Sequence, residues 1–204
     1  MNKFFDKIKS FFKANGEVIT PTAVLAIICV VVTLALSSTN LLTAGKIEAL
    51  AIETQNKAMA KLIEADEYHE LPATTSFGDI TYNAAIKNGD TVGCIFVTEA
   101  NGYGGVVSVM TAVDMEGKII AVEILAAADE TPGLGQNVTK EYFYTRFNGM
   151  SGDIIAAKAG TAKKENNEID AVTGATISSK AVTTAVNQAL DYASEIIVKG
   201  DELK

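Results

Sequence analysis

The sequence Asp170-Ala171-Val172-Thr173-Gly174-Ala175-Thr176 joins a run of small residues to a segment with a helical apolar pattern. Apolar residues recur after it at the three- and four-residue spacing of a helix face, and they are Val182, Ala185, Val186, Ala189, Leu190, Ala193 and Ile197. We expect Ser178 or Ser179 to cap the start of this helix and Gly200 to follow its end. The stretch thus predicts a tight turn that leads into a long C-terminal helix.

The turn leaves room for a bulky group next to the backbone. Gly174 and Ala175 have little or no side chain, and Gly174 can adopt a positive φ. Thr176 then places a hydroxyl at the start of the helix, where backbone N–H groups bind phosphate. This layout suits a threonine that carries a covalently attached phosphate group. An ordinary turn with a helix cap is the alternative interpretation, and these residues alone do not decide between the two.

Two further segments, Glu130-Thr131-Pro132-Gly133-Leu134-Gly135 and Gly102-Tyr103-Gly104-Gly105-Val106, precede the first stretch in the chain. Together the three motifs, in this order and spacing, resemble a family of FMN-binding subunits that includes the G subunit of the Rnf complex, a membrane-bound electron-transfer machine. The chain is similar, less closely, to the C subunit of the sodium-pumping NADH:quinone reductase. The resemblance covers most of the chain, from an apolar N-terminal segment to the last helix.

The resemblance implies that Thr176 bears FMN through a phosphodiester bond, flanked by Thr173, Gly174 and Ala175. It implies a dedicated flavin transferase that installs the FMN, and Asp170 is the expected recognition residue for that enzyme. It also implies electron transfer within a complex of membrane and peripheral subunits. In such a complex, ferredoxin:NAD⁺ oxidoreduction is coupled to the translocation of Na⁺ or H⁺.

The other two motifs are expected to contact the flavin ring. Pro132 fixes φ, and the glycines let the loop approach a flat ring. By resemblance the loop residues are Thr131, Gly133, Leu134 and Gly135, and the opposite wall is formed by Tyr103 and Gly104. Without the family, the same segments are an ordinary loop and a hairpin turn.

One position departs from the family pattern. Many relatives have a histidine two residues before the glutamate of the loop, whereas this chain has Ala128. We therefore assign no acid–base chemistry to the loop. Glu130 is expected to hold it by hydrogen bonds to backbone N–H groups.

The sequence contains no motif that supports another kind of cofactor site. The glycine clusters lack the spacing and the strand–helix setting of a Rossmann or P-loop site. Cys29 lies in an apolar run far from Cys94, so we expect neither a disulfide nor a thiolate metal site. His69 is the one histidine, and we expect it in a surface loop rather than as a ligand.

The N-terminal region has the pattern of a membrane anchor. No charged residue occurs from Val18 to Gly45, and about 20 apolar residues are enough to cross a bilayer as a helix. We predict a transmembrane helix over residues 18–40, and a cleaved signal peptide is the alternative. The leader, residues 1–17, has a net charge of +2, which predicts a cytoplasmic N-terminus and an extracytoplasmic domain.

The leader and the domain also differ in their expected partners. Phe4-Phe5 and Phe11-Phe12 alternate with lysines, which fits either an amphipathic helix on the lipid surface or a disordered basic segment. Residues 38–204 have a net charge of −10, with 13 Lys and Arg against 23 Asp and Glu. Such a domain is not expected to bind nucleic acid.

The rest of the chain predicts an α+β fold with a mainly antiparallel sheet and flanking helices. Residues 41–70 are expected to form a helical stalk, with helix pattern over 41–67 and a break at Leu71-Pro72, and residues 71–204 to form the FMN-binding domain. The β-branched runs 92–99, 106–114 and 119–125 predict strands, with a hairpin turn at Glu116-Gly117. Residues 151–168 resemble a surface excursion.

Three function classes follow. The first is a covalent FMN carrier that relays electrons in an ion-translocating membrane complex, with no stand-alone catalytic site. The second is an FMN-binding subunit of a related quinone reductase or an extracytoplasmic flavin-dependent reductase. The third is a membrane-anchored binding module without redox chemistry. Retention of flavin colour after denaturation excludes the third.

Overall fold

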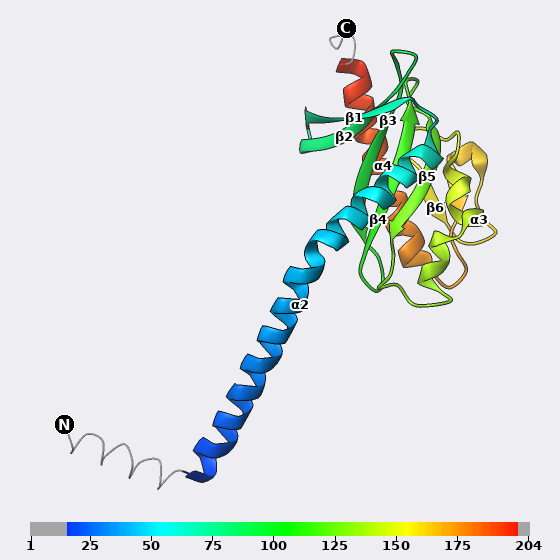
Figure 1. The fold of residues 1–204 in the computed structure, drawn as a ribbon. Helices are drawn as coiled ribbons and strands as arrows, with labels where there is room; N and C mark the ends of the chain where they lie inside the picture. The colour runs from blue at the N-terminus through cyan, green and yellow to red at the C-terminus, as the bar shows by residue number, and fades with distance from the viewer. Residues whose placement is uncertain (1–15, 200–204) are drawn as a thin grey trace. The chain divides into compact units, whose positions relative to one another are not determined.

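The computed structural model of the chain describes residues 16–199 and shows an α+β fold (Figure 1). The expected amphipathic leader and Gly200 lie outside the described residues. The elements, in chain order, are α2 Gly16–Leu62, β1 Glu67–Thr75, β2 Gly78–Lys87, β3 Asp90–Asn101, β4 Val106–Asp114, β5 Ile119–Ala126, η1 Gly135–Thr139, α3 Glu141–Tyr144, η2 Thr145–Phe147, β6 Ile155–Ala157, η3 Lys164–Asn166, β7 Glu168–Asp170 and α4 Thr176–Lys199.

Strands β1 to β5 form one antiparallel sheet in sequential order. The predicted strands at 92–99, 106–114 and 119–125 are confirmed as parts of β3, β4 and β5. The predicted turn at Glu116-Gly117 joins the last two, and Gly117 has a φ of +79° there. Because strand residues alternate between the two faces of a sheet, each face needs its own cover.

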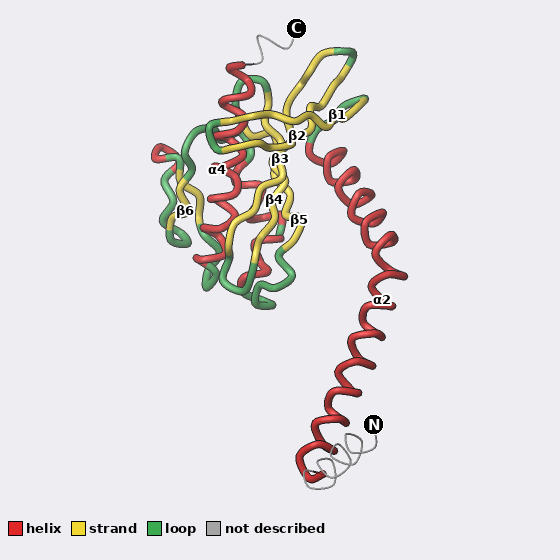
Figure 2. Tube along the Cα trace, turned by 90° about the vertical axis from the view of Figure 1, so that its left-hand side faces the viewer, coloured by secondary structure: helices red, strands yellow, loops and turns green. Residues whose placement is uncertain are grey.

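Helix α4 covers one face of the sheet, as Figure 2 shows. Phe96 of β3 and Val109 of β4 pack toward Val182 and Val186 of the helix in the larger hydrophobic core. Ala185 has no long side chain, so the backbone of α4 comes close enough for Thr98 Oγ1 to donate a hydrogen bond of 2.8 Å to the Ala185 carbonyl. The helix that follows the first motif is therefore fixed directly on the sheet.

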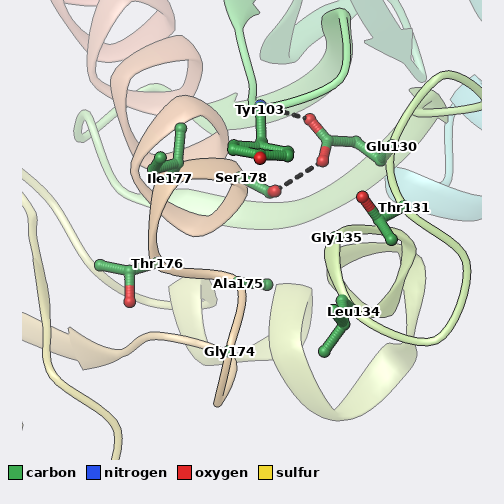
Figure 3. A pocket seen from close by; sticks show the side chains of 10 residues that line it. All are labelled: Tyr103, Glu130, Thr131, Leu134, Gly135, Gly174, Ala175, Thr176, Ile177 and Ser178. Carbon is green, nitrogen blue, oxygen red and sulfur yellow. Dashed lines mark hydrogen bonds between the residues drawn. The ribbon is translucent and has the colours of Figure 1, made fainter.

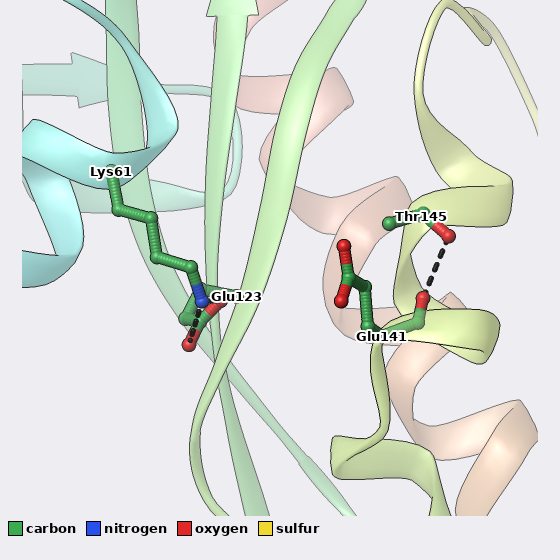
Figure 4. A network of polar contacts seen from close by, with 4 residues as sticks. All are labelled: Lys61, Glu123, Glu141 and Thr145. Atoms are coloured by element: carbon green, nitrogen blue, oxygen red, sulfur yellow. Dashed lines mark hydrogen bonds and ion pairs between the residues drawn. The ribbon is translucent and has the colours of Figure 1, made fainter.

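The last turns of α2 pack on the opposite face. Met59 and Leu62 form a second core with Ile95 and Met110, which occupy the alternate positions of β3 and β4. At its rim, Lys61 Nζ donates to both oxygens of Glu123 on β5, at 2.9 and 2.8 Å (Figure 4). This hydrogen bond raises the pKa of the Lys61 ammonium. In Figure 4, Thr145 also donates to the Glu141 carbonyl, which closes the short α3 turn.

The part of α2 up to Glu53 belongs to a separate unit, and the side chains described between residues 21 and 53 lie largely exposed. Its apolar run is long and apolar enough to cross a membrane. The hydroxyls of Thr33 and Thr39 donate to the carbonyls four residues earlier, at 2.7 and 2.9 Å. Internal bonds of this kind satisfy polar groups where lipid offers no partner.

Several local expectations were wrong. The helix expected over 41–67 ends at Leu62, and Leu71 and Pro72 lie within β1 instead of breaking the chain. Strand β1 is at the edge of the sheet, where a proline without an N–H group is tolerated. Neither β1 nor β2 was predicted from the sequence. Exposed residues, most of them polar, alternate poorly with apolar ones along β1, and the buried stretch of β2 runs over consecutive residues rather than alternating.

Two further details of the C-terminal half differ from expectation. Ser178 and Ser179 lie buried within α4 rather than at its cap, because the helix already begins at Thr176. Ser179 Oγ accepts the Val172 N–H and donates to the Ala175 carbonyl, each at 2.9 Å. The excursion at 151–168 includes β6, which pairs in parallel with β7.

Thr111 provides a test of this packing. Its hydroxyl is buried on β4 without a hydrogen-bond partner among the described residues. Thr111→Val replaces the unsatisfied hydroxyl with a methyl group, so we expect the free energy of unfolding to rise by about 1 kcal/mol. Thr98→Val removes the hydrogen bond to the Ala185 carbonyl and should lower the free energy of unfolding by about 1 kcal/mol. Denaturant unfolding of the detergent-solubilised chain measures both, and a destabilised Thr111→Val protein would contradict this account.

Candidate functional site

Three segments that are distant in the sequence gather around one hollow of about 530 Å³ (Figure 3). They are the connection between β3 and β4, the loop that follows β5, and the start of α4. The lining residues are Tyr103, Glu130, Thr131, Leu134, Gly135, Gly174, Ala175, Thr176, Ile177 and Ser178. The structure therefore brings together residues from all three sequence motifs.

The side chain of Glu130 joins the three segments. It is 1% exposed, and its Oε1 accepts hydrogen bonds from the backbone N–H groups of Tyr103 at 2.7 Å and Gly104 at 3.3 Å. Its Oε2 accepts the Ser178 hydroxyl at 2.7 Å, in the first turn of α4. Figure 3 shows the carboxylate between Tyr103 and Ser178. Glu130 thus accepts backbone hydrogen bonds, as expected, although from the neighbouring loop rather than its own.

At three positions around Glu130 only glycine fits, because a side chain would clash with neighbouring atoms. A Cβ at Gly102 or Gly135 would lie 1.9 or 2.1 Å from a Glu130 oxygen, and one at Gly104 would lie 2.0 Å from the Asp129 carbonyl. These distances are far below a van der Waals contact, so a side chain at any of the three would displace the backbone around the carboxylate. The glycines of the two motifs therefore permit the burial of Glu130.

At two other positions the backbone conformation favours glycine. Gly133 and Gly174 have φ of +76° and +77°, the left-handed region that favours glycine. The positive φ expected at Gly174 is therefore confirmed. Gly133 lies in a loop closed by its own hydrogen bonds, in which Leu134 N–H donates to the Thr131 carbonyl at 3.1 Å and Asn137 Nδ2 donates to the Gly133 carbonyl at 2.7 Å.

Large apolar side chains are exposed on three sides of the hollow. Tyr103 is 71% exposed, Ile177 53% and Leu134 47%. Apolar groups gathered at a concave surface are typical of a ligand site, because a bound apolar ring removes them from water. Ile177 and Ser178 were not predicted from the sequence as residues of the site. The sequence contained one signal for Ile177: it is an apolar residue that directly follows the motif but does not belong to the core face of the helix.

Thr176 is the first residue of α4 and is exposed beside the hollow. Its hydroxyl forms no hydrogen bond with the described part of the chain. The first N–H groups of a helix have no partner within it, and the 24 residues of α4 give this terminus a positive dipole end. Thr173 is also exposed, but it does not line the hollow.

The Asp170 side chain lies away from this hollow. Its carboxylate accepts the N–H groups of Ala162 and Thr161, each at 3.0 Å, and these bonds lower the pKa of the carboxyl group. The Asp170 carbonyl accepts a hydrogen bond from the Arg146 guanidinium. Asp170, Arg146 and Lys164 line a second hollow of about 640 Å³, which was not predicted from the sequence.

The remaining candidate groups lie elsewhere. His69 is on β1, not in a loop, and pairs with Glu67 at 2.9 Å. Cys94 is 3% exposed, and burial raises the pKa of its thiol to about 11. Ala128 is exposed, and its carbonyl accepts Gln136 Nε2 at 3.1 Å. Among residues 16–199 no cluster of His, Cys, Asp and Glu could hold a metal ion.

The family model of the FMN-binding domain matches residues 102–191, which include every residue that lines the hollow. Two solved structures share the fold. The C protein of the Na⁺-translocating NADH-quinone reductase from Parabacteroides distasonis matches with a TM-score of 0.52 and 22% identity, over 60% of this chain and 64% of that one. NqrC from Shewanella oneidensis matches with a TM-score of 0.51 and 16% identity, over 67% and 72%.

Curated relatives match over nearly the whole length. The G subunit of the proton-translocating ferredoxin:NAD⁺ oxidoreductase complex of Clostridium ljungdahlii is 30% identical over 88% of this chain and 93% of its own. The G subunit of the Na⁺-translocating complex of Acetobacterium woodii is 33% identical over 82% of this chain and 87% of its own. The chain therefore belongs to the family of G subunits of ion-translocating ferredoxin:NAD⁺ oxidoreductase complexes, the Rnf complexes.

Proposed function

We propose that this chain is the FMN-carrying electron-transfer subunit of a membrane complex that couples ferredoxin:NAD⁺ oxidoreduction to Na⁺ or H⁺ translocation. We propose that FMN is attached by a bond between its phosphate and Thr176 Oγ1. The observation that carries the proposal is the exposed Thr176 hydroxyl at the N-terminus of α4, beside a hollow with exposed apolar walls.

The residues of the hollow fit FMN. A phosphate on Thr176 would lie at the positive end of α4, where the first N–H groups of a helix have no partner within it. The apolar side chains of Leu134, Ile177 and Tyr103 offer contacts to a flat ring. Gly174 and Ala175 leave room beside the attachment point, since neither has a side chain beyond Cβ.

The protein contributes binding and orientation, while bound FMN supplies the redox chemistry by taking up and releasing electrons. The lining residues include no histidine, and the oxygens of Glu130 are engaged by Tyr103, Gly104 and Ser178. Glu130 therefore acts as a support for the loops. Membership in a related quinone reductase is the second candidate, because the solved structures with this fold include a subunit of that enzyme.

We also propose how FMN is attached to the chain and on which side of the membrane its domain lies. A flavin transferase would recognise Asp170, whose carbonyl and carboxylate are held in place by Arg146 and by the Ala162 N–H. Helix α2 would anchor the chain in the lipid bilayer with its N-terminus in the cytoplasm and the FMN domain outside. The net charge of +2 over residues 1–17 supports this orientation.

Thr176→Val should abolish covalent FMN, because valine keeps the shape of threonine without the oxygen that forms the bond. Thr173→Val is the matched control and should retain the flavin. Peptide mass spectrometry of the chain co-expressed with a flavin transferase, together with flavin fluorescence after denaturation, measures both. Flavin that survives denaturation on the Thr176→Val protein would overturn the assignment.

Glu130→Ala should destabilise the domain by on the order of 3 kcal/mol, since it leaves the buried Ser178 hydroxyl and two part-buried N–H groups unpaired and opens a cavity. Glu130→Gln should cost less, about 1 kcal/mol, because its amide oxygen can still accept N–H groups and its NH₂ can donate to Ser178. The exposed Glu99→Gln is the control. Urea unfolding in detergent compares the three, and equal losses for Gln and Ala would show that charge, not hydrogen bonding, holds the loops.

A reporter fused after Lys204 should be active only outside the cytoplasm, because the basic leader stays inside. Protease added to cells stripped of their wall should remove the domain from the membrane. A cytoplasmic reporter fused to the N-terminus serves as the control for intact membranes. Protection of the C-terminus in this assay would reverse the proposed orientation.

A further inference from the structure

Strand β3 is longer than its pairing with β2. Strand β2 pairs with β3 only as far as Ile95, whereas β4 pairs with β3 as far as Asn101. Residues 96–101 therefore have a strand partner on one side only. In an antiparallel strand about half of the N–H and C=O groups point to each side. No backbone hydrogen bond joins this side of residues 96–101 to another described segment.

The open edge has a structural cause. The tip of the β1–β2 hairpin is tied to α4, because the Ser76 N–H and hydroxyl donate to the Glu195 carboxylate. Phe77 also packs edge-on against Tyr192, with the ring centroids 5.8 Å apart. Figures 1 and 2 both show β1 and β2 running at a steep angle to β3, β4 and β5. The hairpin is thereby drawn away from the second half of β3.

A hollow of about 300 Å³ opens where the strands diverge. Ile80 of β2, Val97 and Thr98 of β3, and Gln188 and Tyr192 of α4 contribute to its lining. Val97 is 40% exposed, although it lies at the centre of the strand. An apolar and partly polar groove beside an unpaired strand edge is the arrangement by which domains accept an extended peptide as an additional strand.

Parts of the two outer edges of the sheet are protected. Strand β1 carries Pro72 and the charged residues Glu67 and Glu70, which are common devices against edge pairing. The start of β5 is covered by a loop, since Ile119 exchanges backbone hydrogen bonds with Gly149 and Met150 at 2.7 and 2.8 Å. Residues 96–101 contain no proline, lysine or bulge on the β4 side. Residues 96–101 are therefore an open strand edge beside a groove, without the proline found on β1 or the loop cover at the start of β5.

We propose that residues 96–101 bind an extended, basic segment of another subunit of the complex, which adds to the sheet beside β3. The inference rests on the proposed function, because relatives are named as subunits of multi-subunit complexes. Glu99 is exposed on this edge, and Asp191 follows Gln188 by one turn of α4. Burial, and after it the nearby carboxylates of Asp153 and Glu195, raise the pKa of Asp191, so three carboxylates lie near one another at this part of α4. A basic segment complements that charge.

The position of residues 96–101 next to the candidate flavin site suggests what the contact with a partner does. Strand β3 ends at Asn101 and continues directly into Gly102 and Tyr103, whose backbone is held by Glu130 in the wall of the candidate flavin site. A strand added along residues 96–101 would thus place part of the partner protein next to that wall. The contact positions a neighbouring subunit beside the flavin site without occupying the hollow itself.

Hydrogen exchange of the full chain tests the proposal, in detergent alone and within the assembled complex. We expect the amides of residues 96–101 that point away from β4 to exchange about tenfold more slowly in the complex than in the isolated chain. Glu99→Arg should lose co-purification with the other subunits and should retain FMN on Thr176. Glu70→Arg, a charge reversal on the exposed edge strand β1, is the matched control and should co-purify normally.

Unchanged exchange in residues 96–101 upon assembly would overturn the edge contact while leaving the proposed function intact. Protection that depends on the concentration of the isolated chain would assign the edge to a second copy and would also overturn it. Failure of the unmodified chain to co-purify with any subunit would instead refute the proposed function, and the edge contact with it.

Discussion

The hydrogen bonds of the buried Glu130 carboxylate are the interactions on which the geometry of the site depends. One oxygen holds the connection between β3 and β4, and the other holds the first turn of α4 through Ser178. A buried carboxylate is costly unless every oxygen is hydrogen-bonded, so the surrounding backbone is fixed by the need to satisfy it. Gly102 and Gly135 are needed in this arrangement because any Cβ there would meet the carboxylate.

The sheet turns this local arrangement into a rigid site. Helix α4 is packed against one face through small residues, and Thr98 is hydrogen-bonded to its backbone. The last turns of α2 pack on the other face, so the segment next to the apolar N-terminal helix contributes to the same domain. Covering both faces leaves the loops at one end of the sheet to form the hollow. The same packing draws the β1–β2 hairpin toward α4 and leaves half of β3 open.

Much of the fold could be predicted from local sequence patterns. The long C-terminal helix follows from apolar residues at helical spacing, and β3, β4 and β5 follow from β-branched runs. These signals are strong because α4, β3 and β4 each bury a run of apolar residues in the core. Strand β1 was not predicted, since this edge strand with several exposed polar residues has little apolar alternation. Strand β2 was not predicted either, because its buried residues are consecutive rather than alternating. Ser178 and Ser179 resembled caps, but burial against Glu130 and the preceding turn gives them other partners.

The sequence by itself determined the motifs, the apolar N-terminal segment and the family, because these depend on residue types and their order along the chain. It also indicated that Glu130 accepts backbone hydrogen bonds. Only the tertiary structure decided which residues meet: Tyr103, Leu134 and Ile177 share one hollow, whereas Asp170 turns its carboxylate to Thr161 and Ala162. These contacts depend on how elements that are far apart in the chain pack against one another. The spacing of residues along the sequence therefore does not predict them without the arrangement of the sheet and α4.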